Sequence, residues 1–533
     1  SQNLKFSSTS LLEEADKLGV TVDLNSTVIG LYQDKEVVVK KDDKITHYKA
    51  DSIIIATGAA ENMVTFPGWT LPGVIGAGAA QTMMNLHGVK PGSRVLMLGS
   101  GNVGLVVSFQ LMQCGCDVVA LVDAAPRVGG YGVHAAKVAR TGVPFYLSHT
   151  IVKAEGDECV TGVTIAEVDS SFKFIPGTEK HFDVDTICLA VGLSPMSQLL
   201  KMAGCEMEDN PKRGGQVPIC DEHGRTSLPG IFVAGDVSGI EEASSAMIEG
   251  RMAGITAAEY LGYTEKDEME TELASLDQAL DGLRQGMFAP SNRGKLIEKT
   301  EEGIEISTNL LKNGYVADDE IERFPGVTHK KGIHPVIECT QNIPCNPCQD
   351  ACPKKCISIG ENITSLPIVL EDSDCINCGM CVASCSGQAI FLVDEDCGDG
   401  SATVTLPYEF LPLPEEGTKG IALGRNGKKV CEATVVSVKT AKAFDKTHLL
   451  TMRVPKEYAM KARFLTLWGK IVAAIVSVFG LHGCDIHAVD YGCPCAEFTM
   501  KGTVTTEENT PLENIRVTVE VWSVAGNDKR QMY

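Results

Sequence analysis

The stretch RVLMLGSGNVG, Arg94–Gly104, decides the fold of the first half of this chain. It is a buried apolar strand that runs into a G-x-G-x-x-G turn, and the apolar residues after it have helical spacing. The glycines of such a turn permit a sharp bend, close approach of the backbone to a pyrophosphate, and close packing of helix on strand. A second strand ends at Asp123, whose carboxylate can accept hydrogen bonds from adenosine ribose hydroxyls. This order predicts a parallel α/β domain that binds a dinucleotide. The predicted contacts in the turn are Gly99, Gly101, Asn102 and Gly104.

The residues after Asp123 indicate which nicotinamide cofactor fits. Ala124 and Ala125 follow it, and neither offers a charge to a 2′-phosphate, so the sequence favours NAD(H) over NADP(H). Arg127 leaves NADP(H) open, because an arginine near this position can accommodate the 2′-phosphate.

Composition limits the class of protein. At 533 residues and 56.9 kDa, the chain is long enough for about three or four domains. Its formal charge of -22 argues against nucleic-acid binding, because phosphate backbones are repelled. Nine of the 20 cysteines fall between Cys339 and Cys385, which favours metal or cluster binding in a reducing, cytoplasmic compartment over a secreted disulfide scaffold.

Three further stretches indicate a flavin site. IATG at 55–58 and LAVG at 189–192 each end a buried strand, and TSLPGIFVAGD at 226–236 closes the α/β region. A glycine at such a strand end lets a cofactor approach, and the aspartate after it can accept a hydrogen bond from a sugar-alcohol hydroxyl. The predicted contacts are Thr57, Gly58, Gly235 and Asp236.

Together these motifs make residues 1 to about 262 resemble the two-dinucleotide flavoprotein reductases related to thioredoxin reductase. The resemblance implies that Asp236 contacts the ribityl chain of FAD and that the GSGNVG turn holds NAD(H). Through LPGVIGAGAAQTMM, Leu71–Met84, the chain is most similar to the flavin subunits of opine oxidase, hydrogen cyanide synthase and dye-linked L-proline dehydrogenase. Thioredoxin reductases carry a redox Cys-x-x-Cys in that stretch, and this chain has no thiol there, so dithiol exchange is not expected.

The sequence departs from that family at its start. The family opens with its own strand, G-x-G-x-x-G turn and helix for the ADP half of FAD, whereas this sequence has one such fingerprint. We therefore expect roughly the first hundred residues of the family pattern to be absent, and the chain alone to bind FAD poorly.

A second cofactor signal lies in two cysteine runs. One is Cys375-x2-Cys378-x2-Cys381-x3-Cys385, and the other is Cys339-x5-Cys345-x2-Cys348-x3-Cys352 followed by proline. The runs resemble a bacterial two-cluster ferredoxin, in which the fourth cysteine of each run ligates the other cluster. That resemblance assigns one 4Fe-4S cluster to Cys339, Cys345, Cys348 and Cys385, and the second to Cys352, Cys375, Cys378 and Cys381.

Two features of the runs differ from the usual ferredoxin pattern, and zinc is the alternative metal. The gap after Cys339 is longer than usual, and Ser386 replaces the usual proline. Structural zinc could use the same thiols, four to a site. Cys356 is predicted to be a core residue.

The tail carries a different pattern. Residues 460–484 have a basic start, a short apolar segment and Leu-x-Gly-Cys ending at Cys484, the layout of a bacterial lipoprotein signal. A buried helix is the alternative. Because such a signal cannot work at this position in a cytosolic flavoprotein, we hypothesise that the chain joins pieces of two genes. A membrane association is expected only if the Cys484 signal is real.

The predicted fold class is therefore an α/β two-dinucleotide flavoprotein with a truncated FAD domain, an α+β two-cluster ferredoxin module, a small β domain and a β-rich tail. The predicted parts are a partial FAD domain (1–60), the NAD domain (61–185), a return to the FAD domain (186–262), a helical linker (263–332), the ferredoxin module (333–396), the small β domain (397–459), the lipoprotein-like segment (460–484) and a partial transthyretin-like β domain (485–533).

The sequence predicts a redox function and offers no catalytic residue, since no Ser/His/Asp set stands out. The leading hypothesis is an oxidoreductase subunit that passes electrons between NAD(H) and a partner protein through FAD and two 4Fe-4S clusters. The alternatives are the flavin and iron-sulfur subunit of an amine, imino-acid or opine dehydrogenase, and a nonenzymatic ferredoxin-like carrier. The substrate, the direction of electron flow and the oligomeric state are not predicted.

Overall fold

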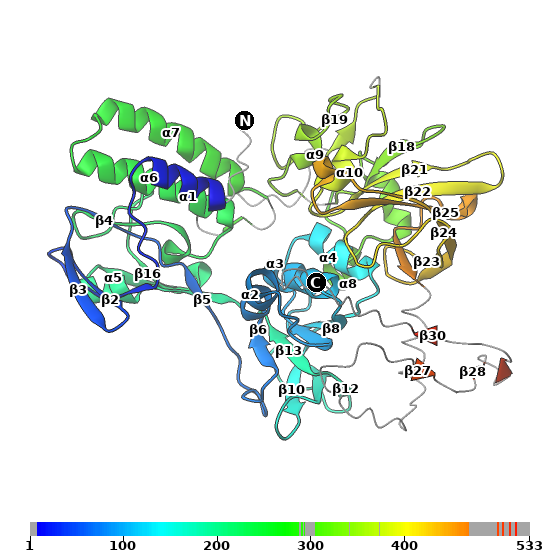
Figure 1. Cartoon of the computed structure of the whole chain (residues 1–533), viewed down its shortest axis with the longest axis horizontal. Helices are drawn as coiled ribbons and strands as arrows, with labels where there is room; N and C mark the ends of the chain where they lie inside the picture. The colour runs from blue at the N-terminus through cyan, green and yellow to red at the C-terminus, as the bar shows by residue number, and fades with distance from the viewer. Residues whose placement is uncertain are drawn as a thin grey trace. The chain divides into compact units, whose positions relative to one another are not determined.

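The computed structural model describes residues 8–286, 289–290, 293, 304–340, 342–371 and 374–467, together with four two-residue strands farther on (Figure 1). The chain divides into two units, Ser1–Leu467 and Trp468–Tyr533. In the second unit, β27 (Phe498–Thr499) pairs with β30 (Thr518–Val519), and β28 (Val504–Thr505) pairs with β29 (Pro511–Leu512). Cys484 and the apolar segment before it lie outside the described residues. None of the described helices is long and apolar enough to cross a membrane.

The predicted nucleotide-binding domain is confirmed as a parallel sheet. Its five strands lie in the order β6-β13-β7-β8-β9, and the strand-turn-helix-strand unit is β7, α3 and β8. The elements are β6 (Val74–Gly76), α2 (Ala77–His87), β7 (Arg94–Leu98), α3 (Asn102–Gln113), β8 (Asp117–Asp123), α4 (Gly132–Arg140), β9 (Phe145–Leu147) and β13 (Thr186–Leu189). The antiparallel strands β10 (His149–Glu155), β11 (Gly162–Glu167) and β12 (Lys180–Phe182) form a separate small sheet.

The flanking segments before and after this domain meet through two short strand pairs. β4 (Ile53–Ile55) runs parallel to β17 (Ile231–Val233), and β5 (Ala59–Glu61) runs antiparallel to β14 (Leu193–Pro195). Residues 193–233 thus pair with the segment before the parallel sheet, whereas β13, which the prediction assigned to the returning segment (186–262), lies in the parallel sheet itself. The surrounding elements are α1 (Ser8–Lys17), β1 (Ser26–Leu31), β2 (Glu36–Lys41), β3 (Lys44–Lys49), α5 (Gln198–Ala203), β15 (Met207–Asn210), η1 (Pro211–Arg213), β16 (Gly215–Pro218), η2 (Gly235–Ser238), α6 (Ala243–Tyr260) and α7 (Lys266–Leu283).

The cysteine-rich region and the region predicted as a separate small β domain share one antiparallel sheet. Its seven strands lie in the order β18-β21-β22-β25-β24-β23-β26, and β21 pairs with β22 across the predicted boundary at 396/397. The strands are β18 (His334–Ile337), β21 (Ile390–Asp394), β22 (Ser401–Tyr408), β23 (Lys419–Leu423), β24 (Lys429–Lys439), β25 (His448–Pro455) and β26 (Phe464–Leu467). Around them lie α8 (Thr308–Asn313), η3 (Asp318–Arg323), α9 (Pro347–Asp350), β19 (Ile357–Ser358), β20 (Ile368–Val369), α10 (Met380–Ser384), η4 (Lys442–Phe444) and η5 (Lys456–Tyr458).

The structure differs from the sequence prediction over residues 460–467, the expected start of a lipoprotein signal. Strand β26 pairs with β23, so these residues are part of the sheet. Arg463, interpreted as one of the basic residues of the signal, is 1% exposed and forms an ion pair with Glu338. A buried arginine that meets a distant carboxylate cannot be told from an exposed one by local sequence.

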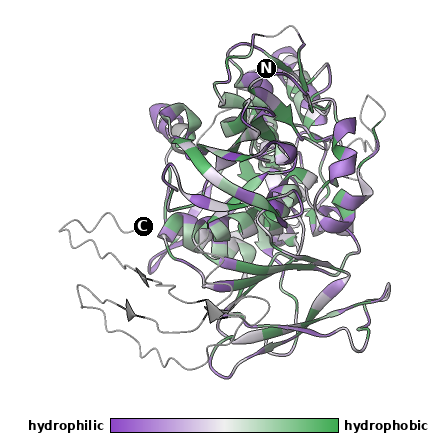
Figure 2. Ribbon diagram, turned by 90° about the vertical axis from the view of Figure 1, so that its right-hand side faces the viewer, coloured by the Kyte–Doolittle hydropathy of each residue, from purple (hydrophilic) through white to green (hydrophobic). Residues whose placement is uncertain are grey.

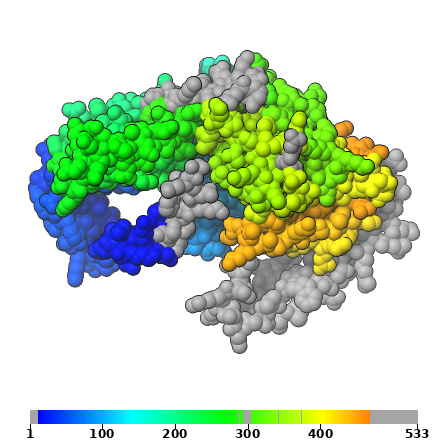
Figure 3. All heavy atoms as spheres, turned by 90° about the horizontal axis from the view of Figure 1, so that it is seen from above, coloured from blue at the N-terminus to red at the C-terminus, as the bar shows by residue number. Residues whose placement is uncertain are grey.

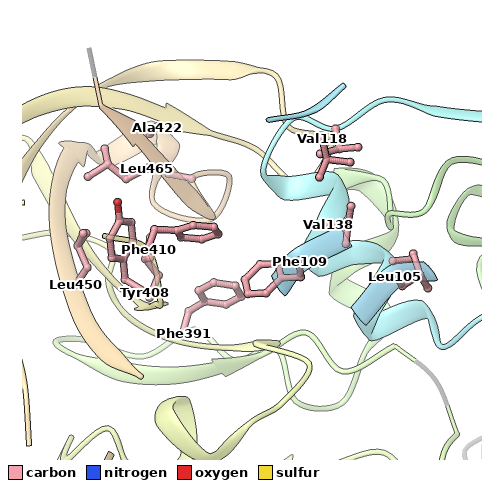
Figure 4. Packing of buried hydrophobic residues seen from close by; sticks show 14 of the residues in the cluster. Leu105, Phe109, Val118, Val138, Phe391, Tyr408, Phe410, Ala422, Leu450 and Leu465 are labelled. Atoms are coloured by element: carbon pink, nitrogen blue, oxygen red, sulfur yellow. The ribbon is translucent and has the colours of Figure 1, made fainter. Parts of the chain in front are cut away.

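One hydrophobic core joins the nucleotide-binding domain to the seven-stranded sheet. It includes Leu105 and Val138 from α3 and α4, and Val404 and Leu450 from the sheet. The rings of Phe109 and Phe410 meet edge to face with centroids 5.3 Å apart, and Figure 4 shows them between the helices and the strands. Hydrophobic residues concentrate in the strands, whereas many outer loops and helices are hydrophilic (Figure 2). The two regions are therefore held together by burial of apolar surface.

Candidate functional site

The glycine turn between β7 and α3 has the geometry of a dinucleotide-binding turn. Gly99 has φ +112°, and a Cβ there would lie 2.2 Å from the Ala190 carbonyl oxygen. A Cβ on Gly104 would lie 2.0 Å from the Gly99 carbonyl oxygen, so helix and strand pack too closely for a side chain. Gly101, at the N-terminus of α3, faces open space. The turn therefore leaves room for a phosphate beside the helix N-terminus.

Asp123 lies at the end of β8 as predicted, and its carboxylate holds the glycine turn. It accepts hydrogen bonds from the Ser100 amide at 2.7 Å and the Ser100 hydroxyl at 2.6 Å, and from the Ala125 amide at 2.8 Å. Part of its acceptor capacity is thus used within the protein. The ribose contact predicted for Asp123 stays a prediction.

A cavity of about 530 Å³ opens beside the turn, within the size range of small-molecule sites. The N-terminus of α3, the start of α6 and the loop before Cys345 all contribute to its wall. Asn102 ties two of these parts together, because it donates to Glu242 at 2.9 Å and accepts from the Tyr131 amide at 2.7 Å. The residues that line the cavity include Glu61, Gly101, Asn102, Val103, Tyr131, Gly192, Lys212, Glu241, Glu242, Arg284, Ile343 and Pro344.

Tyr131 connects the nucleotide side of this cavity to the cysteine side. Burial raises the pKa of Tyr131 well above its ordinary value, and the Glu242 carboxylate raises it further. The ring packs on the cluster that contains Val133, Ile343 and Cys345. A neutral aromatic side chain therefore contacts both the cavity and the residues around the first cysteine run.

The residues predicted to contact flavin lie at the ends of the paired strands β4 and β17. The Thr57 hydroxyl donates to the Met196 carbonyl oxygen at 2.7 Å, and Gly58 has φ +69°. Gly235 has φ +76°, and its amide donates to Glu249 at 2.9 Å. Asp236 accepts a hydrogen bond from the Glu241 amide at 3.2 Å. Strand pairing brings the two groups to one edge, while contact with FAD stays a prediction.

Sequence reasoning missed a buried ion network at that edge. Arg284 donates to Glu241 at 2.9 Å and to Glu249 at 2.6 Å, and Arg293 contacts the same two carboxylates at 2.5 and 3.2 Å. All four side chains are at most 13% exposed. Glu241 and Arg284 also line the cavity. The network fixes the segment after α7 against α6, and only the tertiary structure shows that these charges meet.

The cysteines predicted to form the first ligand set lie near one another. Burial, with a smaller contribution from the thiol of Cys385, raises the pKa of Cys345 and of Cys348 to about 12. Cys339 packs with Cys345 and Cys385 around Ile343. The structure therefore brings together thiols from both sequence runs in the combination that the ferredoxin resemblance implies.

The second predicted set also gathers in one place. Cys352, Cys375, Cys378 and Cys381 line a small pocket. Burial, with smaller contributions from the other three thiols, raises the pKa of Cys381 to about 12. The Cys381 thiol of this set also contributes to the raised pKa of Cys348 in the first set, so the two sets are adjacent. Cys356 is 2% exposed, as expected of a core residue. Among the described residues, no group of three or more His, Cys, Asp or Glu side chains has the geometry of a site for one metal ion.

The surroundings of the first set fit an anionic cluster. Three buried polar atoms near these cysteines, Thr340 Oγ1, Asn342 Oδ1 and Gln388 Nε2, have no hydrogen-bond partner among the described residues. Lys137 and Arg140 of α4 are also buried there, at 9% and 5% exposure. Buried polar groups without partners are costly unless a further group satisfies them. A cluster with net negative charge would accept hydrogen bonds from Thr340 Oγ1 and Gln388 Nε2, whereas Asn342 Oδ1 is itself an acceptor and needs a donor.

The end of α7 also reaches the cysteine region. A Cβ on Gly286 would lie 2.5 Å from the Asn342 carbonyl oxygen, three residues before Cys345. On the face shown in Figure 3, the α7 region (green) lies beside the cysteine-rich region (yellow-green). The linker, the cavity and the first cysteine set thus adjoin.

Comparison with known proteins identifies relatives of the N-terminal half. Residues 2–250 match the family described as Pyridine nucleotide-disulphide oxidoreductase. The chain is 31% identical to an opine oxidase subunit of Agrobacterium tumefaciens over 283 residues, which cover 48% of this chain and 55% of that protein. It is 28% identical to hydrogen cyanide synthase subunit HcnB of Pseudomonas aeruginosa, covering 56% of this chain and 68% of that protein.

Among solved structures, L-proline dehydrogenase from P. horikoshii is 22% identical with a TM-score of 0.38, covering 51% of this chain and 49% of that one. The chain spans about half the length of the matching opine oxidase subunits of Agrobacterium tumefaciens and Rhizobium meliloti, 55% and 52%. The resemblance expected from sequence is confirmed for the flavoprotein part, and the comparisons do not extend it to the cysteine-rich region. Residues 2–250 therefore resemble the pyridine nucleotide-disulphide oxidoreductase family, and this match covers somewhat less than half of the chain.

Proposed function

We propose that this chain is the electron-transfer subunit of a flavoenzyme, passing electrons between NAD(H) and a partner protein through FAD and two 4Fe-4S clusters. The match of residues 2–250 to the pyridine nucleotide-disulphide oxidoreductase family supports the flavin and nicotinamide parts of the proposal. The relatives are themselves named as subunits, which supports a partner protein. Cysteine-ligated clusters require reduced thiols, so the proposed location is the cytoplasm.

One observation carries the proposal. The wall of the 530 Å³ cavity contains both Gly101–Val103 of the glycine turn and Ile343–Pro344, the residues immediately before Cys345. A nucleotide held at the turn would thus face the loop that carries Cys345, a predicted ligand of the first cluster. Electron transfer between the two sites requires such proximity. Two modules that work independently on one chain would not need to be close to each other.

The chain's own groups have distinct tasks in this arrangement. The N-terminus of α3 offers backbone amides and a positive dipole to phosphate groups. Asn102 and Glu242 fix the two sides of the cavity relative to each other through their 2.9 Å hydrogen bond. The partly buried Tyr131 ring packs at the boundary with the cysteine loop. When bound, the nicotinamide and flavin supply hydride chemistry, and the clusters supply one-electron steps.

The test is anaerobic reconstitution of the chain with iron and sulfide, in excess FAD because the chain alone is expected to bind FAD poorly, followed by NADH addition. We expect iron and sulfide in equal amounts, bleaching of the flavin by NADH, and a paramagnetic signal from the reduced clusters. Zinc in place of iron, or protein without inorganic sulfide, would contradict the cluster assignment. Preference for NADPH would contradict the choice of NAD(H).

A second candidate function follows from the relatives. The opine oxidase subunit of Agrobacterium tumefaciens matches 48% of this chain, which favours the flavin and iron-sulfur subunit of an amine, imino-acid or opine dehydrogenase. In that case, electrons reach the flavin only when an amine and the partner protein are both present, and NADH alone leaves it oxidised. A nonenzymatic carrier would contain clusters but show no flavin reduction with either donor.

A further inference from the structure

The strongest feature outside the cavity is a pair of buried cations beside the first cysteine set. Lys137 and Arg140 lie one turn apart on α4 of the nucleotide-binding domain. The Lys137 ammonium donates to the Ser386 carbonyl oxygen at 3.1 Å, and the Arg140 guanidinium donates to the Gly387 carbonyl oxygen at 3.3 Å. These two carbonyls directly follow Cys385 in the chain. One domain therefore places two positive charges on the ligand loop of another.

The contact between α4 and this loop leaves no space for a side chain at Gly387. A Cβ on Gly387 would lie 2.8 Å from Cβ of Val133, one turn before Lys137 on the same helix. The cations also lie against aromatic rings, with Lys137 4.2 Å from the ring centroid of Phe109 and Arg140 5.3 Å from that of Phe391. Because both stems are packed, the charges stay at the ligand loop instead of turning to solvent.

Neither cation forms an ion pair with a carboxylate among the described residues. Burial lowers the pKa of Lys137, and the Glu409 carboxylate partly offsets this effect. The oxygens of Glu409, however, accept hydrogen bonds from Gln113 and Thr447. Burial likewise lowers the pKa of Arg140, and the Glu338 carboxylate partly offsets this effect. Glu338, however, forms its ion pairs with two other arginines, Arg425 and Arg463. Burying a cation without a paired anion is unfavourable in free energy. Burial raises the pKa of the Cys385 thiol, and Lys137 and Arg140 both lie close enough to that thiol to lower its pKa against this larger effect.

We propose that Lys137 and Arg140 are positioning residues that raise the reduction potential of the cluster held by Cys339, Cys345, Cys348 and Cys385 above that of the other cluster. The inference rests on the proposed function. A positive charge stabilises the more negative, reduced cluster, and it acts strongly where water is excluded. Net charge, hydrogen bonds and solvent exposure are the terms by which a protein sets cluster potentials.

The consequence is an order for the two clusters. The cluster next to the cavity accepts an electron more readily than the cluster of Cys352, Cys375, Cys378 and Cys381. The domain that holds the nucleotide thus also sets the electron affinity of its neighbour, through α4.

The experiment is a redox titration of the intact reconstituted chain, followed by electron paramagnetic resonance. Lys137→Met and Lys137→Gln remove the charge, Lys137→Arg keeps it, and Arg140→Gln tests the second cation. We expect each neutral variant to lower the equilibrium constant for one-electron reduction of one cluster about tenfold, which is about 59 mV, and Lys137→Arg to retain the wild-type value. The unaffected cluster is an internal control in each sample.

Iron content shows whether each variant contains its clusters, and circular dichroism shows whether it is folded. Two neutral variants at Lys137 are made so that the test still stands if one of them does not fold. Loaded variants with unchanged potentials would overturn this inference and leave the proposed function intact. An equal shift of both clusters would also overturn it, because it would indicate a general change in structure. Wild-type protein without iron or sulfide would refute the proposed function, and the inference with it.

Discussion

The buried Glu338 carboxylate gives the sharpest test of what holds the cysteine-rich region together. It follows β18, one edge of the seven-stranded sheet, while Arg463 precedes β26, the other edge. Glu338 accepts from Arg425 at 3.0 and 2.5 Å and from Arg463 at 2.5 Å. The ion pairs therefore join residues beside both edges. Glu338→Gln keeps the shape and removes the charge.

The expected loss can be worked out from the carboxylate. Burial by itself would raise the pKa of Glu338, but the guanidinium groups of Arg425 and Arg463 outweigh burial and lower the pKa from 4.5 to about 2. Such a shift corresponds to about 3 kcal/mol of stability, and breaking buried ion pairs costs about 3–5 kcal/mol. Because the folded pKa is depressed, this contribution is present above pH ~4.5 and is lost as the pH falls towards 2.

The assay is urea unfolding by circular dichroism at pH 7 and at acid pH, with hydrogen exchange of β18 and β26 as the local readout. We expect Glu338→Gln to lower the free energy of unfolding by roughly 3 kcal/mol at pH 7, and the difference to shrink as the pH falls. Arg453→Gln is the matched control, because it breaks an exposed ion pair with Asp399 in the same sheet. A loss below about 1 kcal/mol at pH 7, or one independent of pH, would refute this reasoning.

Other substitutions test the remaining parts. Gly104→Ala should prevent correct folding of the turn, because its Cβ would meet the Gly99 carbonyl oxygen at 2.0 Å, whereas Gly101→Ala should fold and bind NADH more weakly, as thermal melting and NADH titration can show. Cys348→Ser should reduce iron content by about half after reconstitution, and Cys356→Ala should retain it, since only the first is a predicted ligand. Phe109→Ala should destabilise the chain by about 3–5 kcal/mol in urea, because the ring is 2% exposed and pairs with Phe410; an unchanged midpoint would show that the shared core contributes little.

The sequence predicts well where chemistry is local. The glycine turn from Gly99 to Gly104 combines steric requirements that residues close in the chain express directly, and the structure shows them at the β7–α3 junction. The ferredoxin resemblance of the cysteine runs likewise implied that Cys385 joins Cys345 and Cys348, and the structure places those thiols together. Both signals are short motifs with a fixed geometric purpose.

Prediction fails where a residue's role depends on a distant partner. The alternation in β22 indicates a strand, but it does not say that the partner is β21 of the cysteine-rich region. The basic residues of α4 are just as ambiguous, because the carbonyls that Lys137 and Arg140 contact lie almost 250 residues later. Charges in sequence predict exposure by default, and only packing shows which of them are buried.

The buried charges around the seven-stranded sheet have two separate purposes that follow from whether they are compensated. Arg425 and Arg463 share Glu338, so their charges close an ion network and contribute to stability. Lys137 and Arg140 have backbone carbonyls as hydrogen-bond partners, so their charges remain available to act on a neighbouring anion. Substituting Glu338 should therefore change unfolding more than cluster potential, and substituting Lys137 should do the reverse. A common response of both properties to both substitutions would show that the two sets of charges act as one network.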